Sequence, residues 1–245
     1  MHSITRQFKK LAGKALHDYR MIEDGDRILL GVSGGKDSVA LVKFLEEHRS
    51  RVPIDYSLVA VHLDLGYDNP AEKESLKNYL KELDVEFHFE DKDYAIVAHS
   101  EVNRENPCFL CASHRRRRLF ELARDFDCCK LALGHNRDDL IETLLLNIFY
   151  SGEISTMIPA QKFFGGALTI IRPLAMVPEA VIHRLVERLG LPAVENQCPT
   201  SGQSKRKEVK TIIANLSRKN DKVPANIFRA LSNYRPDYLL GRPET

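Results

Sequence analysis

The chain has 245 residues, of which 43% are hydrophobic and 29% are charged, and its formal net charge is +2. This composition is typical of a soluble globular protein that forms one large domain, or one domain with a small appendage. No apolar stretch approaches a membrane span and the N-terminus lacks the apolar core of a signal peptide, so we expect a cytoplasmic protein without a membrane partner.

In chain order, the apolar pattern predicts alternating helices and strands. A first helix is expected over residues 4–22, where apolar positions recur at helical spacing. Strands are then expected at 27–32, 54–63, 85–90, 130–134 and 168–171, and helices at 37–49, 70–83, 112–126, 136–150, 178–189 and 204–217. This alternation with short connections predicts an α/β fold, a doubly wound parallel sheet with helices on both faces.

Three regions are expected along the chain. Residues 1–24 form an N-terminal helix, residues 25–200 form the sheet domain, and residues 201–245 form a basic helical extension packed on the same domain. The tail after Asn220 mixes prolines with apolar residues, which predicts a short helix followed by irregular chain.

The sequence Gly-Val-Ser-Gly-Gly-Lys-Asp-Ser at residues 31–38 joins an expected strand to an expected helix. Such a turn presents free backbone N–H groups and the positive end of the helix dipole, and both favour phosphate. A plain Gly-Ser turn explains the glycines but not the Lys-Asp-Ser at a helix start. Close backbone approach, hydroxyl donors and a mobile cation are supplied by Gly34 and Gly35, by Ser33 and Ser38, and by Lys36.

A second polar motif, Gly-His-Asn-Arg-Asp-Asp at residues 134–139, also runs from an expected strand into an expected helix. Ligands of a doubly wound sheet lie beyond the carboxyl ends of its strands, where we place this motif, residues 33–38 and residues 64–68. Acids in a first helical turn can simply cap the helix and satisfy its dipole. Two adjacent carboxylates, Asp138 and Asp139, fit a Mg²⁺–ATP site better, because the metal needs them to neutralise phosphate charge.

The helix expected at 136–150 has an apolar stripe that defines its buried face. Asp138 and Glu142 are four residues apart and share a different face. The stripe consists of Ile141, Leu144, Leu145 and Ile148.

Five cysteines, an odd number without a secretory signal, argue against a disulfide scaffold and favour metal or thiol chemistry. Cys108 and Cys111 are close enough to ligate one centre, and Cys198 lies far away in sequence. Three thiolates can hold three irons of a [4Fe–4S] cluster and leave the fourth open. A structural zinc, with His114 as fourth ligand, and a metal-free thiol–persulfide pair remain alternatives. The other two cysteines, Cys128 and Cys129, are expected to be buried small residues.

Two basic segments fit a polyanionic partner. One is the run of arginines at residues 115–118, and the other lies between Ser204 and Lys222, with seven basic and two acidic residues. Such charge attracts a phosphate backbone, although a solvated helical face is the simpler explanation of either segment. Single-stranded RNA loops present unstacked bases to an enzyme, which suits such a partner better than a duplex does.

Taken together, these motifs resemble the tRNA-thiolating branch of the PP-loop ATP pyrophosphatases, and in particular the tRNA 2-thiocytidine synthetases. The loop is similar to the S-G-G-x-D-S loop that holds the pyrophosphate of ATP. The resemblance runs from about Gln7 to Leu216. It is carried by residues 33–38, by Cys108-x-x-Cys111-x-x-x-Arg115-Arg116, by residues 134–139 with Glu142-Thr143, by Ile171-Arg172-Pro173-Leu174 and by the lone Cys198.

The resemblance implies an enzyme that uses ATP and Mg²⁺ to adenylate the C2 oxygen of a pyrimidine in tRNA, cytidine in the anticodon loop, and replaces that oxygen with sulfur. It implies a [4Fe–4S] cluster on Cys108, Cys111 and Cys198. It also implies a sulfur donor, such as a cysteine desulfurase or free sulfide, and a homodimer. Catalytic roles are implied for Lys36, Asp37, Asp138, Asp139, Cys108 and Cys111, and nucleotide binding for residues 33–38, His62, Asp64, Gly134 and His135.

Two rival functions remain at this point. The extra cysteine pairs that build zinc fingers in 2-thiouridine synthetases are absent from the sequence. A related enzyme of the 2-thiouridine or lysidine synthetase type uses the same nucleotide loops with a different product. A non-catalytic nucleotide-binding or RNA-binding module is the second rival.

Overall fold

The computed structural model describes residues 3–66, 69–101, 103–104, 106–194, 198 and 204–240. Its strands are β1 (Arg27–Gly31), β2 (Ser57–Asp64), β3 (Glu86–Asp91), β4 (Lys130–Leu133), β5 (Ala160–Phe163) and β6 (Leu168–Ile171). Its helices are α1 (Ser3–Asp18), α2 (Lys36–Arg49), α3 (Pro70–Glu82), α4 (Tyr94–Ala98), α5 (Pro107–Asp125), α6 (Arg137–Leu146), α7 (Glu179–Leu189), α8 (Lys205–Ser217) and α9 (Val223–Ala230). Shorter turns are the π-helical η1 (Asn147–Ser151) and the 3-10 turns η2 (Phe164–Gly166) and η3 (Pro236–Tyr238).

Contacts divide the chain into two units. The sheet unit comprises residues 1–137 and 158–203, and the helical unit comprises residues 138–157 and 204–245. The domain boundaries expected from the sequence stay a prediction.

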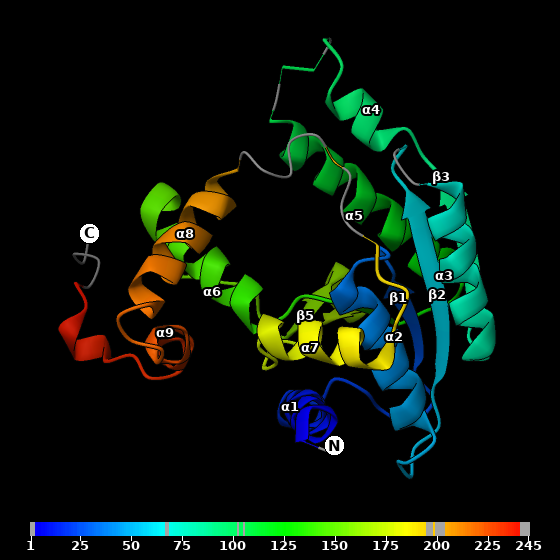
Figure 1. Ribbon diagram of the computed structural model, residues 1–245, viewed down its shortest axis with the longest axis horizontal. Coiled ribbons are helices and arrows are strands. Elements are labelled where there is room, and N and C mark those ends of the chain that lie inside the picture. Colours follow the sequence, from blue (N-terminus) through cyan, green and yellow to red (C-terminus); the bar gives the residue numbers. More distant parts are fainter. Residues whose placement is uncertain are drawn as a thin grey trace. The chain divides into compact units, whose positions relative to one another are not determined.

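One six-stranded sheet, in the order β3-β2-β1-β4-β6-β5, forms the centre of the sheet unit (Figure 1). Neighbouring strands are parallel except β5 and β6, which are antiparallel. The doubly wound sheet is therefore confirmed, with the correction that the edge strand β5 is antiparallel. Its sequence, Ala-Gln-Lys-Phe, contains no β-branched residue, so the strand had little signal of its own.

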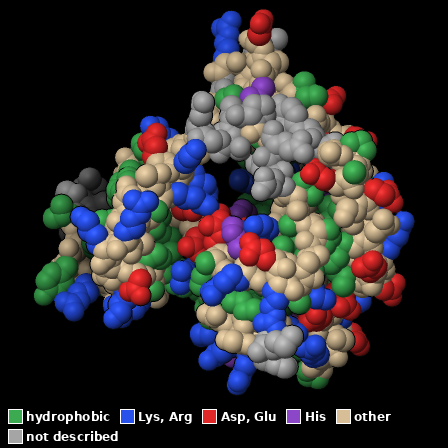
Figure 2. Space-filling model, in the orientation of Figure 1, with side chains coloured by type: hydrophobic (Ala, Val, Ile, Leu, Met, Phe, Trp, Pro, Cys, Tyr) green, Lys and Arg blue, Asp and Glu red, His purple; other side chains and the backbone are tan. Residues whose placement is uncertain are grey.

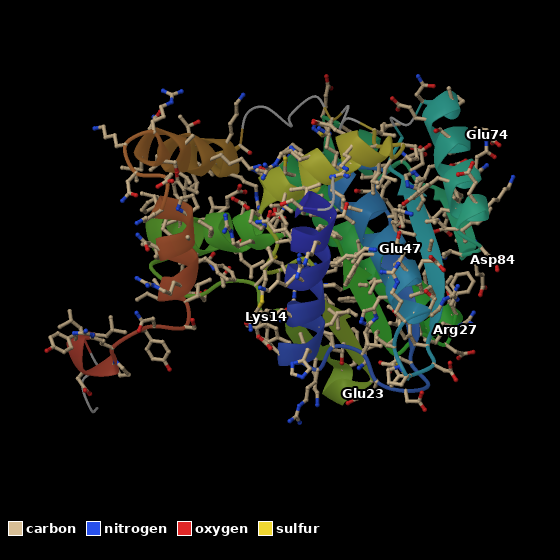
Figure 3. The ribbon with its side chains drawn as sticks, turned by 60° about the horizontal axis from the view of Figure 1, so that its bottom comes forward. Lys14, Glu23, Arg27, Glu47, Glu74 and Asp84 are labelled. Atoms are coloured by element: carbon tan, nitrogen blue, oxygen red, sulfur yellow. The ribbon has the colours of Figure 1, made fainter. Side chains whose placement is uncertain are left out.

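Side chains of the strands alternate between two apolar clusters, one on each face of the sheet. Ile28 and Leu30 of β1 join one cluster, to which α1, α2 and α7 also contribute, whereas Leu29 joins the cluster that α5 covers (Figure 1). At the rim of the first face, Glu47 of α2, labelled in Figure 3, forms ion pairs with Lys9 of α1 and with Lys43. Partial burial raises the pKa of Glu47, but hydrogen bonds from the two lysines outweigh it and lower the pKa overall.

Three parallel strands end at the same edge of the sheet. Gly31 at the end of β1 is in register with Val61 of β2 and with Leu133 at the end of β4. The loop at 33–38 follows β1 and the motif at 134–139 follows β4, so both begin at this edge, as predicted. Of the expected segment 64–68, residues 67 and 68 lie outside the described residues.

Some elements begin or end away from the expected residues. Helix α5 begins at Pro107 instead of residue 112, because the side chain of Asn106 accepts a hydrogen bond from the N–H of Phe109 and proline suits the first helical position. This extension places Cys108 and Cys111 in the first turns of a helix. Helix α1 ends before residue 22, where the chain turns at Arg20 with a φ of 46°.

The helical unit differs from the sequence prediction along α6. The helix ends at Leu146 and continues as the π-helical turn η1, which Gly152 terminates with a φ of 67°. A π turn changes the phase of the side chains that follow it. As a result Ile148, expected in the buried stripe, is 40% exposed. Glu142 lies before this turn; expected off the buried face, it is only 2% exposed because basic side chains of α8 pack against it.

Candidate active site

The loop at residues 33–38 has the backbone of an anion-binding turn. Gly35 is the N-cap of α2. Among the described residues no side-chain hydrogen bond caps this helix, so the positive end of its dipole is open to an anion. Gly34 has a φ of 79°, a conformation open to glycine. Ser38 Oγ donates to the Gly35 carbonyl at 2.8 Å and lies 3.3 Å from Ser33 Oγ. The two hydroxyls thus brace a loop suited to the phosphates of a nucleotide.

Lys36, the predicted mobile cation, begins α2 beside this loop. Its Nζ lies 3.8 Å from Oε1 of Glu187, and about a third of its side chain (36%) is exposed. An exposed pair of this length contributes little to stability. The lysine is therefore able to turn toward a phosphate at small cost.

Gly134 brings the second motif against the first. A Cβ atom at this position would lie 3.2 Å from the carbonyl carbon of Asp37 and 3.2 Å from the backbone nitrogen of Ser38. Both neighbours are backbone atoms at the start of α2, which cannot move aside as a flexible side chain can. Glycine is thus required where the two nucleotide motifs meet.

His62 and Asp64, which the sequence assigned to the nucleotide, direct their side chains into the protein. His62 is 4% exposed, and its Nδ1 lies 2.8 Å from the carbonyl oxygen of Val32. Asp64 accepts a hydrogen bond from the N–H of Gly66 at 2.8 Å and pairs with Lys73 at 2.6 Å. These contacts shape the end of β2, and the nucleotide role of this segment stays a prediction for its backbone.

His135 contacts a buried arginine that lies beyond the end of β6. Arg172 is 5% exposed, its Nε lies 3.3 Å from Nδ1 of His135, and its Nη1 donates to the carbonyl of Ile158 at 2.6 Å. Burial and the nearby charge of Arg116 together lower the pKa of Arg172 to about 10. The sequence analysis named Arg172 only as part of a family motif. Its burial and its contact with His135 make it a positioning residue for that histidine.

Of the three predicted cluster ligands, Cys108 and Cys198 both lie within electrostatic range of Cys111. Burial raises the pKa of the Cys111 thiol, and negative charge on Cys198 and on Cys108 raises it as well, while Arg115 opposes them. Cys108 is exposed, and the other two are partly buried. Cys128 is buried as expected, whereas Cys129 is exposed, contrary to expectation, because its thiol reaches Oδ1 of Asp26 at 3.2 Å at the end of the sheet where β1 begins.

The nucleotide loop contacts a residue that lies close to Cys198 in the sequence. The N–H of Val194 donates to the carbonyl of Gly34 at 2.9 Å, and the side chain of Val194 lies 3.5 Å from the position of a Cβ on Gly34. Cys198 follows four residues later in the sequence, and residues 195–197 lie outside the described residues.

Three thiols are a donor set of the kind that a [4Fe–4S] cluster takes. Among the described residues, no three His, Cys, Asp or Glu side chains are placed to hold one metal ion together. Thiolates on one zinc ion lie within about 4 Å of one another, since each Zn–S bond is about 2.3 Å long. A cubane cluster takes its thiolates at three different irons and so accepts a wider spacing. His114, the alternative zinc ligand, stacks on Tyr94 with ring centroids 5.3 Å apart.

The acids of α6 are held by basic residues of α8, all within the helical unit. Arg206 Nη1 lies 3.1 Å from Asp139 and 3.0 Å from Glu142, and Lys210 Nζ lies 3.4 Å from Glu142. Burial raises the pKa of Glu142, although the charges of Lys210 and Arg206 oppose the shift. Asp138 lies in the first turn of the same helix. Sequence reasoning missed these pairs because the partners are more than sixty residues apart.

Basic side chains gather over α8 and α9 (Figure 2), but only some of them face water unpaired. Arg206 and Lys210 pair with the acids of α6, and Lys205 pairs with Glu208 at 3.2 Å. In the other basic segment, Arg118 forms two hydrogen bonds with Glu90, at 2.8 and 2.9 Å. The count of basic residues in the sequence thus overstates the charge that remains for a polyanion.

Comparisons with known proteins bear on these sites. Residues 1–216 match the PP-loop domain family. A tRNA-cytidine(32) 2-sulfurtransferase from Polynucleobacter asymbioticus is 37% identical over 98% of this chain and 80% of its own length. Another from Geotalea uraniireducens is 38% identical over 96% of this chain and 94% of its own length.

A solved structure is also similar to this chain. The U34-tRNA thiolase NcsA from Methanococcus maripaludis, determined with its [4Fe–4S] cluster, superposes with a TM-score of 0.77 at 26% identity. The match covers 94% of this chain and 78% of that one. Within the described residues, no helix has the length and apolar character needed to cross a membrane.

Proposed function

We propose, because this chain belongs to the PP-loop family and within it to the tRNA-cytidine(32) 2-sulfurtransferases, that it replaces the C2 oxygen of cytidine 32 in tRNA with sulfur at the expense of ATP. One observation carries the proposal from the relatives to this chain. Cys108 and Cys198 both lie within electrostatic range of Cys111, and Val194, four residues before Cys198 in the sequence, donates a hydrogen bond to the carbonyl of Gly34. These contacts support an ATP site next to a three-thiol site.

In the first half of the reaction, the C2 oxygen of the cytidine attacks the α-phosphorus of ATP. The new oxygen–phosphorus bond forms as the bond to the β-phosphate oxygen breaks, and pyrophosphate leaves. We assign the N–H groups at the start of α2 and the ammonium of Lys36 to the negative charge that grows on pyrophosphate. Ser33 and Ser38 hold the loop in the shape that this requires. Asp37, Asp138 and Asp139 are oxygen donors of the kind that Mg²⁺ prefers, and their assignment to Mg²⁺ or to substrate orientation stays a prediction.

In the second half, sulfur replaces the adenylated oxygen at C2, and AMP leaves with the former C2 oxygen. Cys108, Cys111 and Cys198 would hold the [4Fe–4S] cluster; Arg115 counteracts the accumulation of thiolate charge at Cys111. When bound, the cluster supplies an iron without a protein ligand at which sulfide is activated. The protein contributes the placement of these thiols next to the nucleotide loop.

Three further features belong to this proposal. A cysteine desulfurase or free sulfide supplies the sulfur, and the reaction takes place in the cytoplasm, where tRNA and reduced thiols occur together. The enzyme acts as a homodimer. The structural similarity to a U34-tRNA thiolase makes a uridine the alternative target base, so the product nucleoside decides between the two.

The test is mass spectrometry of tRNA nucleosides from cells that lack the gene and carry a plasmid copy. We expect 2-thiocytidine with the wild type and none with Cys198→Ser. The matched control is Cys129→Ser, which changes an exposed cysteine away from the site and should retain the product. Product formation by Cys198→Ser would contradict the assigned ligand, and 2-thiouridine in place of 2-thiocytidine would reassign the base. Pyrophosphate release from ATP that tRNA stimulates separates an enzyme from a binding module.

A further inference from the structure

A groove with a volume of about 640 Å³ lies between α5 and the turn that joins β5 to β6, outside the site described above. This volume is in the range of binding pockets for small molecules or single nucleotides. Its walls combine apolar and cationic side chains, chiefly those of Ser113, Arg116, Phe120, Arg124, Cys128 and Phe164.

The apolar side of the groove presents an aromatic ring in a fixed position. Phe164 is 66% exposed and has a φ of 53°, a conformation uncommon for a bulky residue. Its ring meets the ring of Phe120 edge-on with centroids 5.4 Å apart, and Gly165 and Gly166 follow it, also with positive φ. Strained residues of this kind persist where the surroundings enforce them, and they cluster at binding sites. The ring therefore offers a rigid surface to a planar ligand.

The cationic side of the groove has an excess of positive charge. Three arginines line it, together with one acid, Glu121. Arg117 pairs with Glu121 at 3.2 Å and Arg124 pairs with Asp125 at 3.0 Å, both on the surface. In the described part of the chain Arg116 forms no ion pair and no hydrogen bond, so its charge is available to an anion.

One end of the groove lies near the second nucleotide motif. The charge of Arg116 influences the buried Arg172, which contacts His135. From Ser113 to Arg124 the helix rises about 17 Å, enough for two or three nucleotides of a single strand. A strand that enters the groove at Arg116 can thus follow α5 toward Phe164, beside the start of β6.

We propose that this groove binds single-stranded tRNA a few nucleotides away from the modified base, with a base stacked on Phe164 and phosphates at Arg116 and Arg124. The proposal rests on the function proposed above. Stacking on an aromatic ring combined with arginines along the backbone is how proteins hold unpaired nucleotides. An apolar partner protein would leave Arg116 without an opposite charge, whereas a phosphate group would pair with it.

The test measures tRNA affinity by fluorescence anisotropy at several salt concentrations. Phe164→Asn removes the ring but keeps a residue that tolerates positive φ, and it should weaken binding by about 10-fold or more. Arg116→Gln with Arg124→Gln should lower the slope of log affinity against log salt by about 1 for each arginine. The control, Arg6→Gln, changes an exposed arginine of α1, which packs on the other face of the sheet, and should bind as the wild type does.

If both groove variants keep the tRNA affinity and the salt slope of the wild type and still thiolate tRNA, the groove does not bind tRNA. The proposed function would remain in place. A wild-type protein that neither binds nor thiolates tRNA would instead overturn the function. Analytical sedimentation tests whether a second copy of the chain occupies the groove instead. A dimer that dissociates on Phe164→Asn without loss of tRNA affinity would make the groove a subunit interface and refute the proposal. If Phe164→Asn does not fold, Phe164→Tyr, which keeps the stacking ring, should bind normally while the arginine pair carries the test.

Discussion

The sheet unit and the helical unit hold their polar residues in place by different means. In the sheet unit, Gly34 and Gly134 set the nucleotide loop through backbone contacts, and apolar clusters support it from both faces. In the helical unit, Asp139 and Glu142 are held by the opposite charges of Arg206 and Lys210. The first arrangement depends on shape and the second on charge. A single carbon atom added to a loop glycine should therefore disturb the sheet unit, and the loss of a single charge should destabilise the helical unit.

The largest effect is expected from Gly134→Val. The new side chain would displace backbone atoms of Asp37 and Ser38 that lie 3.2 Å from its Cβ. A misplacement approaching 1 Å costs about 100-fold in rate, so tRNA-stimulated pyrophosphate release should fall by about that factor.

The control for this change is Gly13→Ala in α1, where nothing lies within 4 Å of the added carbon. It should keep full activity and stabilise the helix by about 0.5–1 kcal/mol. Equal pyrophosphate release by the wild type and Gly134→Val would show that shape does not govern the loop.

A smaller effect is expected from Arg206→Met in the helical unit. This change leaves the 2%-exposed carboxylate of Glu142 with Lys210 as its remaining cation among the pairs described. The free energy of unfolding should fall by about 2 kcal/mol, which urea denaturation followed by circular dichroism measures.

Two further variants sharpen this result. Glu142→Gln added to Arg206→Met removes the buried charge and should recover part of the loss. Lys207→Met, on the exposed side of the same helical turn, should leave the urea midpoint unchanged. A loss that is the same for Lys207→Met and Arg206→Met would indicate general damage to α8 instead of a lost charge pair.

The smallest effect is expected where the sheet unit itself uses charge. Glu90 of β3 accepts two hydrogen bonds from Arg118 of α5, and that arginine lowers the pKa of Glu90. A lowered folded-state pKa contributes stability above the unfolded value, near 4.5, and this contribution disappears as pH falls through the folded value.

Glu90→Gln should therefore cost about 1 kcal/mol at pH 7 and less at acidic pH, since both proteins are then uncharged at this position. Urea unfolding at pH 7 and at pH 3.5 measures the difference. A cost that stays constant between these two values would mean that the charge of Glu90 plays no part.

Much of the sheet unit was predictable from local patterns. The resemblance to tRNA-thiolating PP-loop enzymes is confirmed by the relatives. Gly34, Lys36 and Ser38 were assigned together because one short loop before α2 contains them all, and their phosphate-binding role stays a prediction. Cys108 and Cys111 share one motif, whereas the place of Cys198 beside them came from the family resemblance alone.

What the sequence could not show depended largely on partners remote in sequence. Val32 and Lys73 contact the side chains of His62 and Asp64, whose nucleotide role stays a prediction. Glu142 was placed off the apolar stripe, and its partner, Arg206, comes from a helix more than sixty residues later. Periodicity assigns a face to a side chain but cannot name what covers that face.

The hydrogen bond from Val194 to the Gly34 carbonyl has a consequence during turnover. A bond of 2.9 Å tolerates displacements of only a few tenths of an ångström, so a shift of the loop on release of pyrophosphate must either move Val194 or break the bond. Occupancy of the phosphate site is thereby linked to the position of one peptide group, which lies four residues before Cys198 in the sequence.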